Sequence, residues 1–529
     1  MRKKNSVFNI IGTLGSYFAA LIFNFITQAC IIKILGIEYS GINGLFTNIL
    51  TMLSIAELGI GTTIVYKLYK PIAENNTEEI KSWMKFYKVC YRYVALFVLI
   101  IGISLIAFVP KIVGEVSFND NIIVLYLISL LDTILSYIMT YKRSLLYANQ
   151  KNYIINIVHT CYIVLMNITQ IILLYFAKNY VLFLSVKLVF RVMENLVINI
   201  YVDKKYGFIN EKSKDISEDE RKDILRRIKA MFLQKVSFVI NKGIDNIVIS
   251  VFLGIVSVGY YTNYNLIAIT ISTVIYQLVS SMTASVGNLL TENDCKKSYE
   301  IYKKINMLNS FITGMCMAGF CCIITPFIKI WVGEKYLLDN VIMLSFVLYI
   351  YADSIRRAIT IFKEAAGICK EDQFMYVIMA VINLISSILL CKIIGISGVV
   401  IGTAISYIFL IVYSYPKYIF KPLFKLNYKQ YHKENIKYFI FITLSCAIAY
   451  IICNSVHFES SILQLAFNGI VAVIITICTF LIFYKNSSEY KYYKELLVSI
   501  ITKLKRNLIK IWFLGGVFYA SNNFSCWNG

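Results

Sequence analysis

Charged residues, proline and histidine are all scarce in this sequence. Only 16% of the 529 residues are charged, five are proline and three are histidine, whereas 58% are hydrophobic. Soluble globular proteins contain roughly 25% charged residues, so this composition excludes a soluble domain and predicts a polytopic membrane protein. The apolar stretches are continuous and do not alternate with polar residues, which favours membrane-spanning helices over a β-barrel.

The sequence also offers little for catalysis or metal binding. His159, His432 and His457 are far apart, and the 13 cysteines lie mostly within apolar runs, with no paired CxxC motif at zinc-ligand spacing. No phosphate-binding loop for nucleotide hydrolysis is present. The longest expected external loops, near residues 111–120 and 332–337, are too short for a catalytic domain. We therefore expect a protein that is not an enzyme and that uses no cofactor and no metal.

Long apolar stretches indicate that the chain crosses a membrane about 14 times. A helix needs roughly 20 apolar residues to cross the hydrocarbon. The expected spans are residues 7–32, 43–66, 87–110, 121–141, 153–176, 180–202, 231–253, 258–290, 305–331, 338–362, 373–391, 395–416, 438–455 and 461–484. The first span is too long for the apolar core of a signal peptide and lacks a small-residue cleavage site, so it is expected to be retained.

The distribution of positive charge predicts the orientation of these spans. Most of the 52 lysine and arginine residues lie in the N-terminal segment, in the loops after even-numbered spans, and in the C-terminal tail. Because positive charge is enriched on the cytoplasmic side, both termini are expected in the cytoplasm. The net charge of +22 then belongs to loops that face anionic lipid headgroups, and no nucleic-acid partner is expected.

An internal repeat appears when the sequence is compared with itself at an offset of 218 residues. This offset aligns Leu35, Gly36, Ile37 and Gly41 with Leu253, Gly254, Ile255 and Gly259, Glu74 and Asn75 with Glu292 and Asn293, and Ala148 with Ala366. One offset that aligns three separate loops predicts two related membrane halves, an organisation typical of transporters. The expected units are a six-helix lobe at 1–206, a cytoplasmic linker at 207–229, a second six-helix lobe at 230–420, two additional helices at 421–485, and a basic cytoplasmic tail at 486–529.

The polar segment at 203–229 separates the two halves. Ser217 is followed by Glu220 at the spacing of a capping box, in which each side chain caps the backbone of the other residue. This pattern predicts that a short amphipathic helix begins here. We expect the segment to be a linker on the inner membrane surface.

Ionisable side chains within the expected spans are the candidates for a functional site. Each costs roughly 2.5–3.5 kcal/mol at the centre of a membrane helix, so such residues usually have a purpose. The candidates for a substrate cavity are Lys187, Arg191, Glu194, Lys235, Lys242, Asp245, Asp353, Arg356 and Arg357, and the candidates for ion coupling or a structural pair are Glu57 and Asp245. The alternative for each residue is an ion pair that only holds helices together. A cavity lined by lysine and arginine would instead hold a large anion.

Helical spacing predicts which of these residues meet. Lys187, Arg191 and Glu194 are four and then three residues apart, so they share one helical face and Arg191 can pair with Glu194. Arg356 can pair with Asp353 in the same way.

Three segments resemble a known family. The segments are SIAELGIGTTIVYKLYKPIAENN at 54–76, LLYANQKNY at 145–153 and FKEAAGICKED at 362–372. Together they resemble the polysaccharide repeat-unit flippases of the multidrug/oligosaccharidyl-lipid/polysaccharide exporter superfamily, over roughly residues 1–485. The resemblance implies two six-helix bundles in a MATE-like V around a central cationic cavity, plus two C-terminal helices.

The resemblance also implies a substrate and a location. The family moves polyprenyl-pyrophosphate-linked oligosaccharides across the bacterial cytoplasmic membrane for cell-surface polysaccharide synthesis, so the implied partners are this lipid, membrane lipids and other polysaccharide-assembly proteins. The family's cationic cavity corresponds here to Arg191, Lys242, Arg356 and Arg357. Two alternatives stay open: a MATE-like ion-coupled drug or metabolite antiporter, in which unpaired acids would dominate the cavity, and a non-transporting scaffold or polymerase of a glycan-assembly complex.

Overall fold

The computed structural model describes residues 2–57, 60–138, 140–368, 370–499 and 502. The helices in this part of the chain include α1 (Arg2–Ile34), α2 (Ile37–Leu53), α3 (Ile60–Ala73), α4 (Thr77–Leu105), α5 (Val109–Val113), α6 (Ile122–Ile138), α7 (Arg143–Ala148), α8 (Asn152–Ala177), α9 (Tyr180–Lys205), α10 (Glu218–Leu253), α11 (Ile255–Ser280), α12 (Thr283–Leu290), α13 (Cys295–Trp331), α14 (Asn340–Ile355), α15 (Arg357–Ala366), α16 (Gln373–Ile394), α17 (Ile396–Phe409), α18 (Lys421–Phe424), α19 (Tyr428–Ser455) and α20 (Ser461–Tyr484). These described ranges contain no strand. The predicted all-α fold is confirmed. Most of the tail expected at 486–529 lies outside the described residues.

Eleven helical stretches in the described part of the chain are long and apolar enough to cross a membrane. Three further expected spans correspond to α2 with α3, to α9, and to α14 with α15. α2 and α14 have only 17 and 16 residues, and a second helix follows each after a break. α9 is long enough but carries Lys187, Arg191 and Glu194. Helix breaks and charged side chains therefore explain why these three spans are less apolar or shorter than the others.

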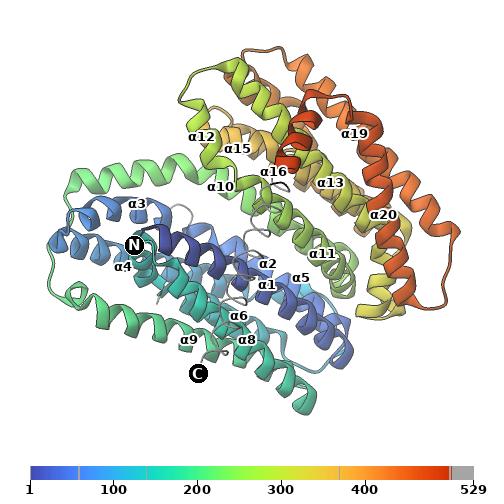
Figure 1. The fold of residues 1–529 in the computed structure, drawn as a ribbon. Coiled ribbons are helices and arrows are strands. Elements are labelled where there is room, and N and C mark those ends of the chain that lie inside the picture. Colours follow the sequence, from blue (N-terminus) through green and yellow to red (C-terminus); the bar gives the residue numbers. More distant parts are fainter. Residues whose placement is uncertain (1, 58–59, 139, 369, 500–501, 503–529) are drawn as a thin grey trace, which may run out of the picture.

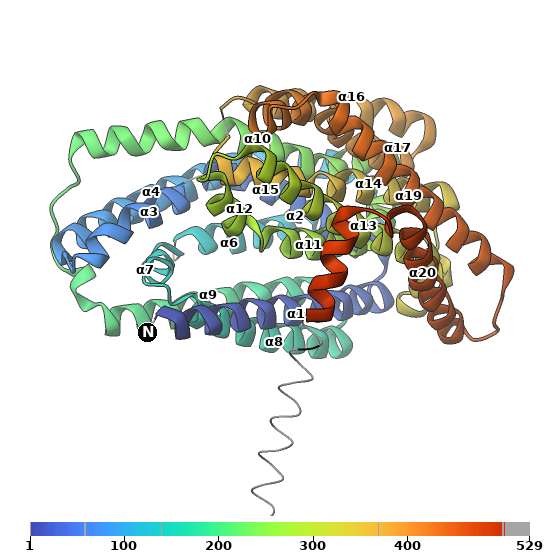
Figure 2. The ribbon, with the colours of Figure 1, turned by 45° about the horizontal axis from the view of Figure 1, so that its top comes forward.

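The helices form two groups, which Figure 1 shows in blue to teal and in green to red. In the N-terminal lobe, formed by α1–α9, α1 packs on α8, α8 and α6 pack on α9, and α4 packs on α6. In the C-terminal lobe, formed by α10–α18, α16 packs on both α10 and α17, and α14 packs on α13 and α17. α19 and α20 pack on each other and on α13. Figure 2 shows α1, α8 and α9 side by side along one edge of the N-terminal lobe.

The backbone carries the internal repeat that the sequence predicts. Gly36 and Gly254 have positive φ angles of 110° and 82°, and Asn75 and Asn293 have φ angles of 53° and 54°. Few residues other than glycine and asparagine adopt this region readily. The same offset also relates the first residues of α2 and α11, and those of α4 and α13. The two halves therefore turn at matching positions.

The two lobes approach most closely where α2 crosses α11. A Cβ atom on Gly41 would lie 2.3 Å from the carbonyl oxygen of Ile255, and one on Gly259 would lie 2.4 Å from the carbonyl oxygen of Ile37. Adding the repeat offset of 218 residues to Gly41 and Ile37 gives Gly259 and Ile255, so each contact is the counterpart of the other. The crossing is therefore a local pseudo-twofold contact in which the two helix backbones touch.

The capping box predicted at the junction is present, but the helix that it begins is not short. The Ser217 hydroxyl accepts a hydrogen bond from the backbone N–H of Glu220 at 3.3 Å, and α10 then continues without a break to Leu253. No glycine or proline occurs between Glu218 and Gly243 to interrupt it. The expected separate amphipathic helix is therefore wrong. The first part of α10 instead packs beside α3, where Lys67 and Asp223 form an ion pair at 3.0 Å.

Two expected spans are also interrupted. The span expected at 43–66 divides into α2, a 3-10 turn at Ser54–Glu57 and α3, and the span expected at 338–362 divides at Arg356 into α14 and α15. Both breaks place ionisable side chains at helix ends, where backbone groups also lack helical partners.

Candidate functional site

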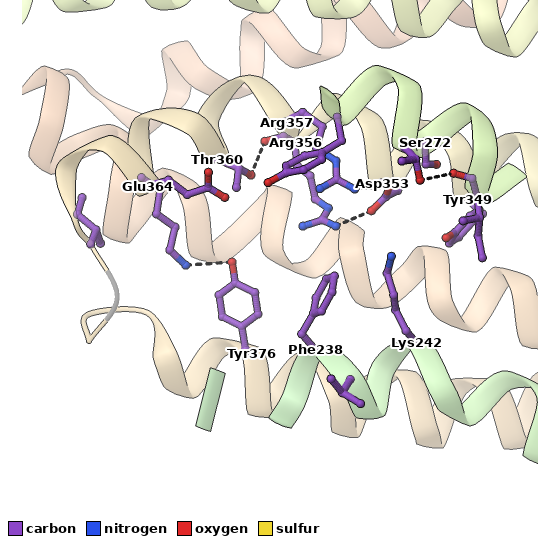
Figure 3. Close-up of a pocket in the computed structure, with 16 residues that line it drawn as sticks. Phe238, Lys242, Ser272, Tyr349, Asp353, Arg356, Arg357, Thr360, Glu364 and Tyr376 are labelled. Carbon is purple, nitrogen blue, oxygen red and sulfur yellow. Dashed lines mark hydrogen bonds and ion pairs between the residues drawn. The ribbon is translucent and has the colours of Figure 1, made fainter. Parts of the chain in front are cut away.

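A cavity of about 610 Å³ lies within the C-terminal lobe, among α10, α11, α14, α15 and α16 (Figure 3). Its charged lining residues are Lys242, Asp353, Arg356, Arg357, Lys363 and Glu364. Four cations face two carboxylates, so the cavity carries a net positive charge. The remaining wall includes aromatic and hydroxyl side chains, among them Phe238, Tyr276 and Thr360.

Asp353 organises the two arginines of this cavity. One carboxylate oxygen accepts a hydrogen bond from Nη2 of Arg356 and the other accepts one from Nη2 of Arg357, both at 2.5 Å. Asp353 is 1% exposed and Arg356 is 3% exposed. Because one carboxylate serves two guanidinium groups, Asp353 balances only one of their two positive charges. The buried Nε atoms of both arginines lack a hydrogen-bond partner within the described structure.

Lys242 contributes a third cation, which is not in direct contact with a carboxylate of the described residues. Within the described residues it forms no ion pair, and its ammonium lies 5.1 Å from the centre of the Phe238 ring. Figure 3 shows Lys242 extending from α10 toward the side of the cavity that holds Asp353. Lys242 and the two arginines therefore approach the cavity from different helices, an arrangement that can bind one anion at several points.

Two charged residues of this cavity, Lys363 and Glu364, were not among the predicted site residues. Lys363 donates to Asp372 at 2.5 Å and to the Tyr376 hydroxyl at 3.0 Å, and Glu364 also lines the wall. The expected span ended at residue 362, whereas α15 continues to Ala366. Both residues lie in the segment at 362–372, which carries part of the family resemblance, so the sequence does contain a signal for them.

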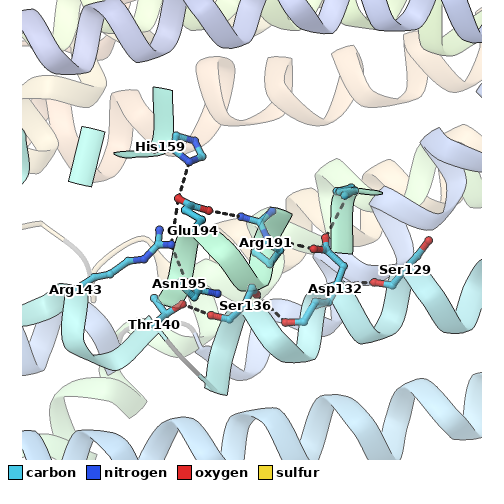
Figure 4. Close-up of polar contacts among 11 residues, drawn as sticks. Ser129, Asp132, Ser136, Thr140, Arg143, His159, Arg191, Glu194 and Asn195 are labelled. Carbon is cyan, nitrogen blue, oxygen red and sulfur yellow. Dashed lines mark hydrogen bonds and ion pairs between the residues drawn. The ribbon is translucent and has the colours of Figure 1, made fainter. Parts of the chain in front are cut away.

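A second charged cluster lies in the N-terminal lobe (Figure 4). Asp132 of α6 accepts a hydrogen bond from Nε of Arg191 at 3.2 Å and pairs with Lys187 at 3.4 Å. Arg191 also pairs with Glu194 at 3.2 Å. The predicted shared face of Lys187, Arg191 and Glu194 and the predicted Arg191–Glu194 pair are both present.

Glu194 has two further partners. Arg143 of α7 lies 3.1 Å from its carboxylate, and Nδ1 of His159 in α8 lies 2.9 Å from the same oxygen. Arg143 also donates to the Asn195 side chain at 2.7 Å. This cluster therefore ties α6, α7, α8 and α9 together. Each of its two carboxylates contacts at least two basic side chains.

The two candidates for ion coupling lie apart from both clusters. Asp245 is 5% exposed and accepts hydrogen bonds from the hydroxyls of Tyr261 at 3.1 Å and Thr403 at 3.0 Å. Glu57 accepts a hydrogen bond from the Tyr91 hydroxyl. Within the described part of the chain, neither carboxylate has a basic side chain as an ion-pair partner.

The predicted site residues therefore divide between locations. Lys242, Asp353, Arg356 and Arg357 line one cavity, whereas the Lys187 group lies in the other lobe and Asp245 lies outside the cavity lining. The side chain of Lys235 lies outside the described residues. A role of these residues in binding a substrate stays a prediction.

Comparison with known families shows to which family the chain belongs. The model of a family described as "Polysaccharide biosynthesis protein" matches residues 34–339, which is more than half of the sequence. The chain belongs to this polysaccharide biosynthesis family. The matched region includes the N-terminal cluster and the α10 and α11 walls of the C-terminal cavity. No curated protein matches the chain.

Two solved structures share the fold. One is described as lipid II flippase MurJ in an inward closed conformation; it is 18% identical, with a TM-score of 0.63, and the match covers 92% of this chain and 100% of that one. The other is an inward-facing multidrug resistance MATE family transporter of the MOP superfamily; it is 13% identical, with a TM-score of 0.58, and the match covers 73% of this chain and 91% of that one. The expected fold of two helical bundles with additional C-terminal helices is confirmed.

Proposed function

We propose that this family member is a flippase that moves polyprenyl-pyrophosphate-linked oligosaccharides from the inner to the outer face of the bacterial cytoplasmic membrane. The products would enter capsule, exopolysaccharide or another cell-surface polysaccharide. The observation that carries the proposal is the net positive cavity formed by Lys242, Arg356, Arg357 and Lys363 within a chain of a polysaccharide biosynthesis family. The proposed activity is transport without a catalytic step.

The chemistry of the cavity suits this substrate. A pyrophosphate and its attached sugars lose hydrogen bonds to water when they enter hydrocarbon, and this loss opposes unassisted crossing. The guanidinium groups of Arg356 and Arg357 are planar donors that suit phosphate oxygens, and Lys242 adds a compact positive charge. These groups replace the lost hydration while the isoprenoid chain stays in the lipid.

Transport by this fold requires the cavity to open to each side in turn. We infer that the units at 1–206 and 230–420 move as two bodies about the α2–α11 crossing. With both termini in the cytoplasm, an inside-negative membrane potential favours outward movement of an anion by about 2.3 kcal/mol per charge per 100 mV. The potential therefore drives the substrate in the direction needed for export.

Deletion of the gene tests the proposal. We expect a polyprenyl-pyrophosphate saccharide to accumulate on the cytoplasmic face, because synthesis continues when export is blocked. Lipid extraction and mass spectrometry would measure it and reveal its sugars. A normal level of lipid-linked saccharides together with altered sensitivity to cationic drugs would contradict the flippase and support the antiporter.

The antiporter is favoured by one specific observation. Asp245 is a buried carboxylate without an ion-pair partner in the described structure, and the chain shares its fold with a MATE transporter. The Asp353 carboxylate in the main cavity is, however, saturated by two arginines. Because the cavity that could hold a large substrate is cationic, export of an organic cation is the weaker proposal.

The ion-coupling role of Asp245 leads to a testable prediction. Replacing Asp245 with asparagine should remove the dependence of transport on an imposed proton or sodium gradient, because the amide keeps one acceptor oxygen for the hydroxyls of Tyr261 and Thr403 but cannot bind the ion as a carboxylate does. Proteoliposomes with imposed gradients measure this dependence. Glu57→Gln tests the second candidate in the same assay. Gradient dependence that persists in both variants would exclude both residues.

A further inference from the structure

A smaller cavity of about 190 Å³ lies in the N-terminal lobe, between α2, α6 and α9. Its wall is rich in hydroxyl groups, which come from Thr47, Thr51, Ser54, Ser129, Thr133 and Tyr137. It also contains one carboxylate, Asp132, and one ammonium, Lys187. Its composition therefore differs from that of the cation-rich cavity in the other lobe.

Most hydroxyl hydrogens in this wall are already used. Thr51 donates to the carbonyl of Thr47 at 2.6 Å and Ser54 donates to the carbonyl of Thr51 at 2.5 Å. Ser129 donates to the carbonyl of Leu125 at 2.9 Å and Thr133 donates to the carbonyl of Ser129 at 3.1 Å. A hydroxyl that donates to its own helix still has lone pairs available to accept. The wall is therefore a set of acceptors and attracts a ligand that carries many O–H donors.

The charged pair completes this pattern. Asp132 is 7% exposed and is held by Arg191 and Lys187, so its carboxylate is a fixed acceptor. Phe46 and Tyr137 supply aromatic surface in the same wall. The Asp132 carboxylate and the acceptor oxygens would repel an anion. A neutral polyhydroxylated ring could instead donate hydrogen bonds to these oxygens and pack its apolar face on the aromatic side chains.

The cavity lies between α2 and the α6 and α9 helices of its own lobe, and Thr51 places one edge of it near the contact of α2 with the other lobe. A Cβ atom on Gly44 would lie 2.6 Å from the Thr262 hydroxyl of α11, and Thr51 follows Gly44 by seven residues, or about two helical turns. Gly44 and Thr51 therefore share one face of α2. Sites for drug-sized ligands measure roughly 300–1,000 Å³, so this smaller cavity suits one part of a larger substrate.

We propose that this N-terminal cavity binds a sugar residue of the transported saccharide, while the C-terminal cavity binds the pyrophosphate. The proposal rests on the flippase function inferred above. It assigns selection among saccharides to Thr51, Thr133 and their neighbours, and it assigns attraction of the anionic lipid to the other lobe.

The test compares two ligands and two sets of variants. The ligands are the lipid-linked saccharide that accumulates after gene deletion and bare undecaprenyl diphosphate, and binding is measured on the full chain purified in lipid nanodiscs. The double variant Thr51→Val, Thr133→Val keeps the side-chain shape but removes two acceptor oxygens. The matched control is Thr169→Val in α8, where a half-buried threonine donates to the carbonyl of Leu165 in the same way.

We expect the double variant to bind the saccharide-bearing lipid about tenfold or more weakly, because each hydrogen bond contributes about 1 kcal/mol. Its affinity for undecaprenyl diphosphate should change by less than about twofold, and the control should match the wild type with both ligands. Unchanged affinity for the saccharide-bearing lipid, or equal weakening with both ligands, overturns the sugar site. A wild-type protein that binds neither ligand overturns the flippase function itself.

Discussion

Replacing Lys242 with alanine should reduce export of the lipid-linked saccharide by about tenfold or more, because a hydrogen bond to a charged group contributes about 1.5–3 kcal/mol. The variant should remain folded, since within the described residues Lys242 has no carboxylate that its removal would leave buried and unpaired. The accumulation of the lipid-linked saccharide in cells that express the variant measures the effect.

Lys392→Ala is the matched control for this variant. The Lys392 ammonium lies 5.4 Å from the centre of the Phe252 ring, much as Lys242 lies against Phe238, but Lys392 does not line the cavity. We expect normal export from the control. Equal export from both variants would remove Lys242 from the binding site.

Arg356 is a less informative position for the same test. Its guanidinium is buried and shares Asp353 with Arg357, so its removal changes the balance of a buried ion cluster. Breaking such a cluster destabilises proteins by several kcal/mol. Lost export from an Arg356 variant would therefore not separate binding from folding, whereas lost export from a Lys242 variant would.

The sequence was sufficient to predict the helical membrane fold, its repeat and most of its spans. Apolar length dictates a spanning helix because the bilayer has a fixed thickness, and the recurrence of Gly36 at Gly254 reflects a turn that both halves need. Helix interruptions at Glu57 and Arg356 were not predicted. They depend on contacts with neighbouring helices, which a single stretch of sequence does not reveal.

The site was predicted less completely than the fold. Spacing along α9 predicted that Lys187 and Arg191 share a face, but their common partner Asp132 is on α6 and periodicity cannot identify it. The same limit applies to Asp245, which shares α10 with Lys242 yet contacts Tyr261 and Thr403 outside the cavity. Residues on one helix therefore lie in different environments, and their spacing alone does not show which of them line the cavity.

Alanine at Gly41 or at Gly259 should destabilise the protein, and the two variants should be affected similarly. Each new Cβ atom would lie 2.3 or 2.4 Å from a backbone carbonyl of the facing helix, which no side-chain rotation can relieve. Overpacking of this kind costs about 1–3 kcal/mol. Thermal unfolding of the purified protein, followed by size-exclusion chromatography in detergent, measures the loss.

Gly319→Ala in α13 provides the control, because nothing lies within 4 Å of the position of its new Cβ atom. A helical glycine replaced by alanine without a clash gains about 0.5–1 kcal/mol, so this variant should be as stable as the wild type or more so. The comparison therefore separates the clash from the change in helix propensity. A Gly41 variant as stable as the Gly319 variant would mean that α2 and α11 do not touch at their backbones. A large loss at Gly41 with none at Gly259 would contradict the reciprocal contact, because the pseudo-twofold crossing makes each glycine the counterpart of the other.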